Sequence, residues 1–227
     1  MQGGRPGWSL AVLSVAALGC AASRPLRPLP AGTVAAEVSL PAVWEQSGGN
    51  TYPVGAPVVG VRYGVTDRTE AALRWNPGLL ILGIVGIEGA GVWHVRAANG
   101  WIPAVHLCGT LSLMVAPAQL HDGVRGALAA DVTAHWEPLS WLWPYLVEQD
   151  AVILATGQHV ASAFLGAQLP LSPRWDVSVE TGLAGWNLDA RRYSQPYLNV
   201  LGRGALWLGG AVTCRFGAAA RPDSERP

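Results

Sequence analysis

Alternation of apolar and polar residues over residues 59–75 restricts the fold of this chain more than any other feature. In "VGVRYGVTDRTEAALRW", Arg62, Glu70 and Arg74 fall on one side of a hairpin. The other side carries an apolar set: Val61, Tyr63, Ala71, Leu73 and Trp75. A period of two places successive side chains on opposite faces of a strand, and the polar turn at residues 66–68 joins two such strands. The stretch therefore predicts an antiparallel hairpin with one apolar and one charged face.

The same period recurs along the rest of the chain. Candidate strands lie at residues 33–44, 55–65, 69–76, 85–97, 101–115, 124–136, 145–156, 160–171, 174–186 and 199–216. Asn99-Gly100 and "LSPRW" at 171–175 are turn signals, while residues 45–53 and 188–196 are expected to be rim loops. No stretch after the N-terminus reaches the roughly 18–20 apolar residues of a membrane helix. The pattern predicts an all-β, antiparallel up-and-down β-barrel of about ten strands, with eight as the alternative.

Composition favours a transmembrane barrel over a soluble sandwich. Hydrophobic residues make up 50% of the chain and charged residues only 13%, against roughly 25% in soluble domains. The polar face of residues 127–135 is small and sparsely charged, as in a narrow barrel interior. Eleven Trp against two Phe suits aromatic girdles at a membrane surface. Zero net charge with scattered arginines excludes a nucleic-acid footprint.

The N-terminus has the pattern of an export signal. Residues 1–19 combine Arg5, an apolar core and small residues before Cys20, and are too short for a membrane span. "ALGC" resembles a bacterial lipobox, which implies a diacylated Cys20; ordinary cleavage near "CAAS" is the alternative. The domain prediction is a signal peptide (1–19), a lipidated Cys and Pro-rich tether (20–32), the barrel (33–216) and a disordered tail (217–227).

Charged residues on the inward faces are the candidate site. A lumen charge network is expected from Arg62, Glu70, Arg74, Glu88, Arg96, Asp131 and Glu180. Charges inside a narrow barrel need partners, so a filled lumen is favoured over a solute path or an enzymatic arrangement. No catalytic residue, metal site or cofactor is predicted, although His106 and His135 could approach in adjacent strands. Cys108 and Cys214 fall on opposite faces, which argues against a disulfide.

Three segments resemble small bacterial outer-membrane β-barrel proteins. They are "VGVRYGVTDRTEAALRW", "LGAQLPLSPRWDVSVETGLAGW" and "LWLGGAVTCRF", the last with a terminal aromatic at Phe216. The resemblance implies an outer-membrane location, contacts with outer-membrane lipid and barrel-assembly machinery, and a structural or interaction role without catalysis. A small pore or transporter, an outer-membrane lipid hydrolase and a soluble periplasmic lipocalin-like lipoprotein are the alternatives. The tail after Phe216 departs from the family, whose assembly signal usually ends at the aromatic.

Overall fold

The computed structural model describes residues 24–47, 49–82, 84–115, 124–192 and 197–217. The expected signal peptide, Cys20 and residues 218–227 of the expected tail lie outside this range. No helix within the described ranges is long and apolar enough to cross a membrane.

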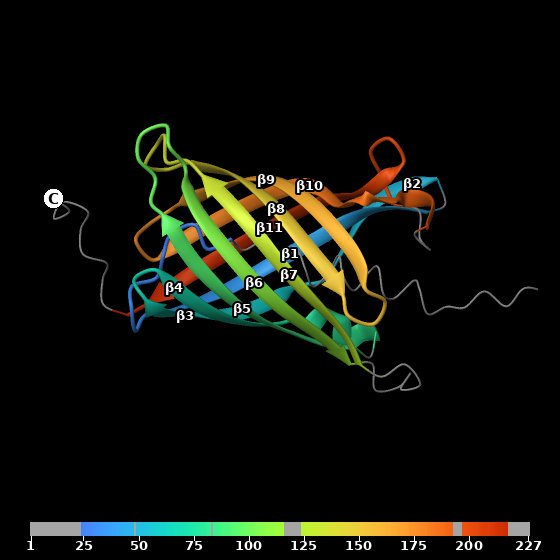
Figure 1. The fold of residues 1–227 in the computed structure, drawn as a ribbon, viewed down its shortest axis with the longest axis horizontal. Coiled ribbons are helices and arrows are strands. Elements are labelled where there is room, and N and C mark those ends of the chain that lie inside the picture. Colours follow the sequence, from blue (N-terminus) through green and yellow to red (C-terminus); the bar gives the residue numbers. More distant parts are fainter. Residues whose placement is uncertain (1–23, 48, 83, 116–123, 193–196, 218–227) are drawn as a thin grey trace, which may run out of the picture.

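The described chain forms a closed antiparallel ten-strand β-barrel (Figure 1). Its strands are β1 (Val34–Ser47), β3 (Val58–Thr66), β4 (Thr69–Trp75), β5 (Val85–Arg96), β6 (Ala104–Val115), β7 (Val124–His135), β8 (Trp143–Ile153), β9 (Gln158–Pro170), β10 (Trp175–Asp189) and β11 (Arg203–Phe216). Each strand pairs with its sequence neighbour, and β11 closes the sheet on β1 from Val34↔Phe216 to Val43↔Trp207. Each of the ten predicted segments corresponds to one of these strands, so the ten-strand prediction is confirmed and the eight-strand alternative is wrong.

Two expected rim loops are partly strand. β1 runs to Ser47, and β2 (Asn50–Gly55) returns along it, so most of residues 45–53 extend a hairpin beyond the barrel wall. β2 and β3 continue one register against β1, interrupted at Ala56 and Pro57. Thr51, Tyr52 and Val54 are residue types that favour strands. The sequence prediction missed this strand because the segment as a whole is polar. β10 similarly extends to Asp189, before a 3-10 helix at Ala190–Arg192.

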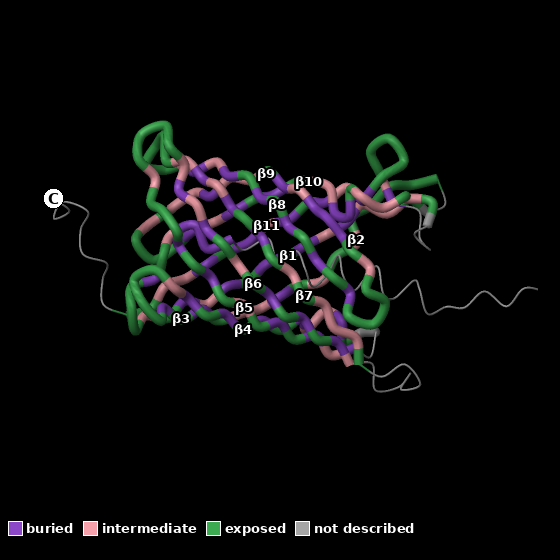
Figure 2. The backbone as a smooth tube through the Cα atoms, in the orientation of Figure 1, coloured by how far each residue is buried: buried purple, intermediate pink, exposed green. Residues whose placement is uncertain are grey.

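The alternation separates a buried inner face from an exposed outer one. In β4, Glu70, Ala72 and Arg74 are buried, while Leu73 and Trp75 are exposed. Figure 2 shows the same switch between buried and exposed positions along the other wall strands. Each of the ten wall strands contributes a large exposed apolar side chain: Val38, Val61, Leu73, Ile87, Leu111, Leu128, Leu146, Leu165, Val179 and Leu208. The outer wall is therefore apolar around its whole circumference.

Exposed tryptophans gather near the two rims. Trp93, Trp101 and Trp175 lie near the rim that also carries the start of β1 and the end of β11. Trp75 and Trp186 lie towards the opposite ends of β4 and β10. Indole rings with one polar edge collect where apolar and aqueous media meet. The outer surface thus has aromatic side chains at both ends of an apolar band.

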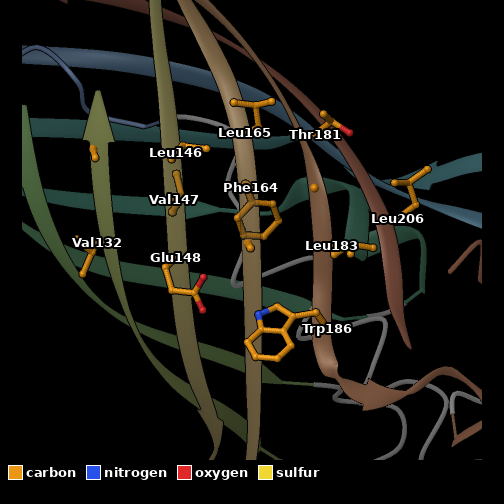
Figure 3. Close-up of a pocket in the computed structure, with 13 residues that line it drawn as sticks. Val132, Leu146, Val147, Glu148, Phe164, Leu165, Thr181, Leu183, Trp186 and Leu206 are labelled. Atoms are coloured by element: carbon orange, nitrogen blue, oxygen red, sulfur yellow. The ribbon is translucent and has the colours of Figure 1, made fainter. Parts of the chain in front are cut away.

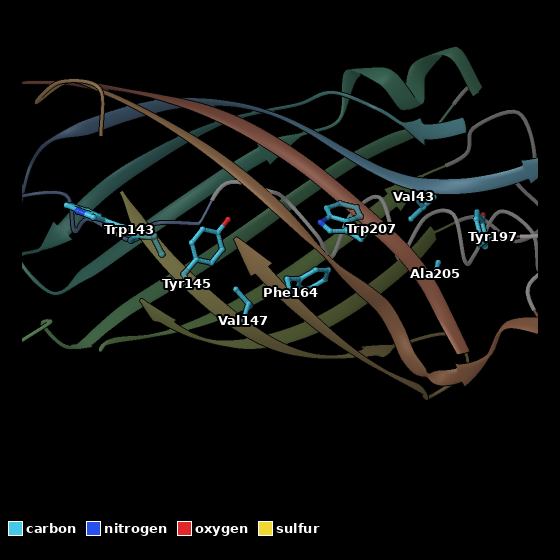
Figure 4. Packing of buried hydrophobic residues seen from close by; sticks show 9 residues of the cluster. Val43, Trp143, Tyr145, Val147, Phe164, Tyr197, Ala205 and Trp207 are labelled. Atoms are coloured by element: carbon cyan, nitrogen blue, oxygen red, sulfur yellow. The ribbon is translucent and has the colours of Figure 1, made fainter. Parts of the chain in front are cut away.

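The inner face is packed with aromatic and polar side chains. Figure 4 shows Tyr145, Phe164 and Trp207 at this face, from β8, β9 and β11. Tyr145 crosses Gly166 of β9 so closely that a Cβ there would lie 2.2 Å from the Cζ atom of the ring. Only glycine leaves room for the ring at this position.

Cys108 and Cys214 occupy opposite sides of the wall. Cys108 of β6 shares the inner face with His106 and Thr110, whereas Cys214 of β11 shares the outer face with Val212. Both thiols are free. The prediction that they do not form a disulfide is confirmed.

Candidate functional site in the barrel lumen

Six of the seven residues expected in the lumen charge network have buried inward side chains: Arg62, Glu70, Arg74, Glu88, Asp131 and Glu180. Arg96 does not join them. A bulge between His94 and Arg96 shifts the register at the end of β5, so Arg96 is exposed and its Nε and Nη2 donate to the carbonyl of Pro103 at 3.2 and 2.9 Å. Alternation alone could not predict this, because a bulge breaks the period of two.

The first ion-pair group lies near the rim that carries the β3–β4 turn. Arg62 donates to Glu70 Oε2 through Nε at 2.9 Å and Nη2 at 2.6 Å. His94 Nε2 contacts the other oxygen, Glu70 Oε1, at 2.8 Å, and the backbone N–H of Leu29 donates to it at 3.0 Å. Glu70 of β4 therefore contacts both neighbouring strands, β3 and β5, and the segment that precedes β1.

The second group joins β1, β4, β5 and β6. Arg74 donates to Glu37 Oε1 and to Glu88 Oε1, each at 2.5 Å, and the Ser112 hydroxyl donates to Glu88 Oε2 at 3.3 Å. Gly60 stands beneath this bridge, where an added Cβ would lie 2.9 Å from both Arg74 Cγ and Glu37 Oε1. Glu37 was absent from the expected set, although its alternation with Ala36 and Val38 could have placed it inward.

The third group contains Arg24, which the sequence placed in the Pro-rich tether. Arg24 Nε lies 3.1 Å from Glu180 Oε2, and its Nη1 lies 3.4 Å from Asp131 Oδ2. Trp207 Nε1 donates to Glu180 Oε1 at 3.2 Å. No pattern within residues 20–32 predicts these contacts, because the partners are 107 and 156 positions away in the chain.

Residues 24–30 enter the lumen as a segment without helix or strand, with Pro28 and Pro30 exposed. Leu26 and Leu29 are 1% and 0% exposed, and the Arg27 guanidinium lies 4.7 Å from the ring centroid of Trp143. Leu26 belongs to the same buried apolar cluster as Tyr145. We call residues 24–30 the lumen segment. Its buried side chains pack against those of the inner face.

A row of histidines connects the lumen to one rim. His94 and His106 rings meet edge to face at 4.5 Å, and His106 Nε2 lies 2.8 Å from His135 Nδ1. His135 Nε2 then lies 3.1 Å from Glu137 Oε1, whose side chain is 44% exposed. The sequence allowed for the approach of His106 and His135. Within the described ranges, no group of three or more His, Cys, Asp or Glu side chains is arranged to hold a metal ion.

The hydrolase alternative requires a nucleophile beside a histidine and an acid. Ser112 donates to Glu88 instead. On the outer wall, His159 Nε2 and Asp150 Oδ1 form an exposed pair at 2.7 Å. His159 Nδ1 lies 3.4 Å from Asn187 Nδ2, and among the described residues no serine, threonine or cysteine side chain hydrogen-bonds this histidine.

An open recess of about 800 Å³ lies on the outer wall across β7 to β11 (Figure 3). Its lining includes the small residues Ala163 and Gly182 and the larger apolar side chains of Leu165 and Trp186. Glu148, in the middle of β8, also lines it. An apolar medium would disfavour this carboxylate.

Comparisons with known proteins support no assignment to a family. No family model matches the chain, and no curated protein matches it. Among solved structures, the chain is similar to an outer-membrane channel from Pseudomonas putida F1, at 12% identity and a TM-score of 0.45 over 86% of this chain and 99% of that one. It is also similar to the NanC porin, at 9% identity and a TM-score of 0.43 over 81% of this chain and 100% of that one. A third similar structure is the N-terminal β-barrel domain of Pseudomonas aeruginosa OprF, at 10% identity and a TM-score of 0.36 over 83% of this chain and 100% of that one. Values this low carry no information on ligand or activity.

Proposed function

We propose that this chain is a bacterial outer-membrane β-barrel protein with a structural or interaction role and no catalysis, and that its lumen is closed at rest. The observation that carries the proposal is the outer apolar band, to which all ten wall strands contribute. Contiguous apolar surface of this extent is unfavourable in water and favourable against lipid. Tryptophans at both ends of the band fit the two membrane surfaces.

The filled lumen supports the closed state. Three ion-pair groups and the lumen segment occupy the interior, and the arginines of each group are paired with its carboxylates. Small barrels are generally filled by side chains in this way. A lumen of this kind gives rigidity to the barrel and leaves its rims and outer wall as the surfaces that can contact lipid or protein partners.

Gel mobility of the mature protein extracted from outer membranes tests the proposal. We expect the unboiled protein in SDS to migrate differently from the boiled protein, because a closed barrel resists the detergent. Identical mobility, together with release into water when Cys20 is replaced by Ser, would instead favour the soluble lipocalin-like lipoprotein.

A small pore is the second candidate, and one observation favours it. The lumen segment belongs to no wall strand. Within the described ranges its backbone donates to the wall at Leu29, to Glu70 Oε1 at 3.0 Å, and its other polar contacts with the wall come from the Arg24 and Arg27 side chains. A segment of this kind can leave the lumen without breaking the barrel. Conductance across planar bilayers separates the two candidates: the closed barrel gives no steady current, whereas a pore conducts.

Export and lipidation are part of the proposal. Residues 1–19 serve as the signal, and Cys20 is the proposed lipid-bearing residue of the mature protein. Three residues lie between Cys20 and Arg24, so the two Cα atoms can be at most about 14 Å apart when the chain is extended. Mass spectrometry of the mature N-terminus distinguishes diacylated Cys20 from ordinary cleavage.

A further inference from the structure

Arg24 occupies a site that the wall of the barrel builds without it. Asp131 comes from β7, Phe164 from β9 and Glu180 from β10. These residues are 6%, 3% and 2% exposed, respectively. The guanidinium arrives from the lumen segment. The anionic and aromatic parts of the site thus belong to the rigid sheet, and the cation belongs to a segment outside it.

The contacts of Arg24 are those expected for recognition of a planar organic cation. Its Nε and Nη2 face the two oxygens of Glu180 at 3.1 and 3.5 Å, and its Nη1 faces Asp131 at 3.4 Å. Its Cζ lies 5.5 Å from the ring centroid of Phe164. Paired contacts to a carboxylate and a cation above an aromatic face are both favourable for a guanidinium. Together they select charge and shape.

Wall residues hold both carboxylates in place independently of Arg24. Trp207 Nε1 donates to Glu180 Oε1 at 3.2 Å, and Thr133 Oγ1 donates to Asp131 Oδ1 at 3.3 Å. Among the described residues, Arg24 is the cation that forms ion pairs with Asp131 and Glu180. Without it, two fixed carboxylates would remain buried beside an aromatic ring, which is costly unless another cation enters.

We propose that Asp131, Phe164 and Glu180 form a lumenal binding site for a small guanidinium-bearing solute, in which Arg24 is the tethered occupant. A free ligand of this class binds when Arg24 leaves. The proposal goes beyond the function proposed above, since binding to the site requires neither conductance nor a particular membrane.

The test is chemical rescue of Arg24→Ala in the full chain, folded in detergent micelles. The probe is methylguanidinium at millimolar concentration. Urea, a neutral molecule of similar planar shape, and sodium chloride at equal ionic strength are the controls. We expect methylguanidinium to raise the unfolding temperature of the variant with saturation and to change its tryptophan fluorescence through Trp207. The wild-type protein, with its site occupied, should not respond in this way.

The double variant Arg24→Ala, Glu180→Gln provides the matched control. Loss of the charge-assisted contacts should weaken methylguanidinium binding about ten- to a hundredfold. Equal responses of Arg24→Ala to methylguanidinium and sodium would overturn the proposal, as would full rescue of the double variant. If Arg24→Ala does not fold, refolding yield becomes the readout: recovery with methylguanidinium but not urea supports the site, and no difference between them refutes it.

Discussion

Replacing Arg74 by Leu tests whether ion pairs stabilise the filled lumen. Arg74 lies 2.5 Å from carboxylate oxygens of both Glu37 and Glu88, and all three residues are at most 5% exposed. The substitution removes the cation that both carboxylates share while they stay buried. Breaking a buried ion pair by removing one partner costs about 3–5 kcal/mol. Since small proteins have a total stability of about 5–15 kcal/mol, the variant should fold but unfold far more readily.

A neutral version of the same group separates charge from packing. The triple variant Arg74→Leu, Glu37→Gln, Glu88→Gln removes both carboxylate charges along with the cation. Because no buried charge lacks compensation, we expect its free energy of unfolding to return to within about 1–2 kcal/mol of the wild-type value. Arg68→Leu, at an exposed turn position, is the control and should change stability by no more than about 0.5 kcal/mol.

The assay is urea unfolding of the protein folded into lipid vesicles. Tryptophan fluorescence reports the transition, and gel mobility of unboiled samples checks it independently. A loss below about 1 kcal/mol for Arg74→Leu, or a triple variant no more stable than the single one, would refute the claim that this group stabilises the barrel.

Three further outcomes are expected. Gly166→Ala should cost about 1–3 kcal/mol in the same urea assay, because the ring of Tyr145 has to move; unchanged stability would contradict the close packing. Glu148→Leu should stabilise the barrel in vesicles, because it removes a charge from an apolar medium. The gain should be smaller than the roughly 2–4 kcal/mol that an arginine costs on the lipid face at the midplane. A destabilised variant would mean that the carboxylate has a favourable contact in the native barrel. Thiol titration of the unreduced, denatured protein should find Cys108 and Cys214 both free, whereas the loss of both thiols would indicate a disulfide.

Much of the barrel follows from the sequence because strand alternation is a local property. Arg62, Glu70 and Arg74 could be placed inward from the hairpin alone, since a charge on the lipid side would be unfavourable. The same reasoning separated Cys108 from Cys214. It failed at Arg96, where a bulge breaks the period, and within residues 45–53, where polar composition concealed a strand.

The sequence by itself determined the strands, their number and the side of the wall on which most side chains lie. Only the tertiary structure decided which charges meet. Arg24 reaches Asp131 and Glu180 because the barrel closes around the lumen segment. Glu37 of β1 reaches Arg74 of β4 because Gly60, on the strand between them, has no side chain to block the ion pair. Alternation specifies a face but contains no information on partners far along the chain. Barrel closure supplies those partners, and the lumenal site depends on them.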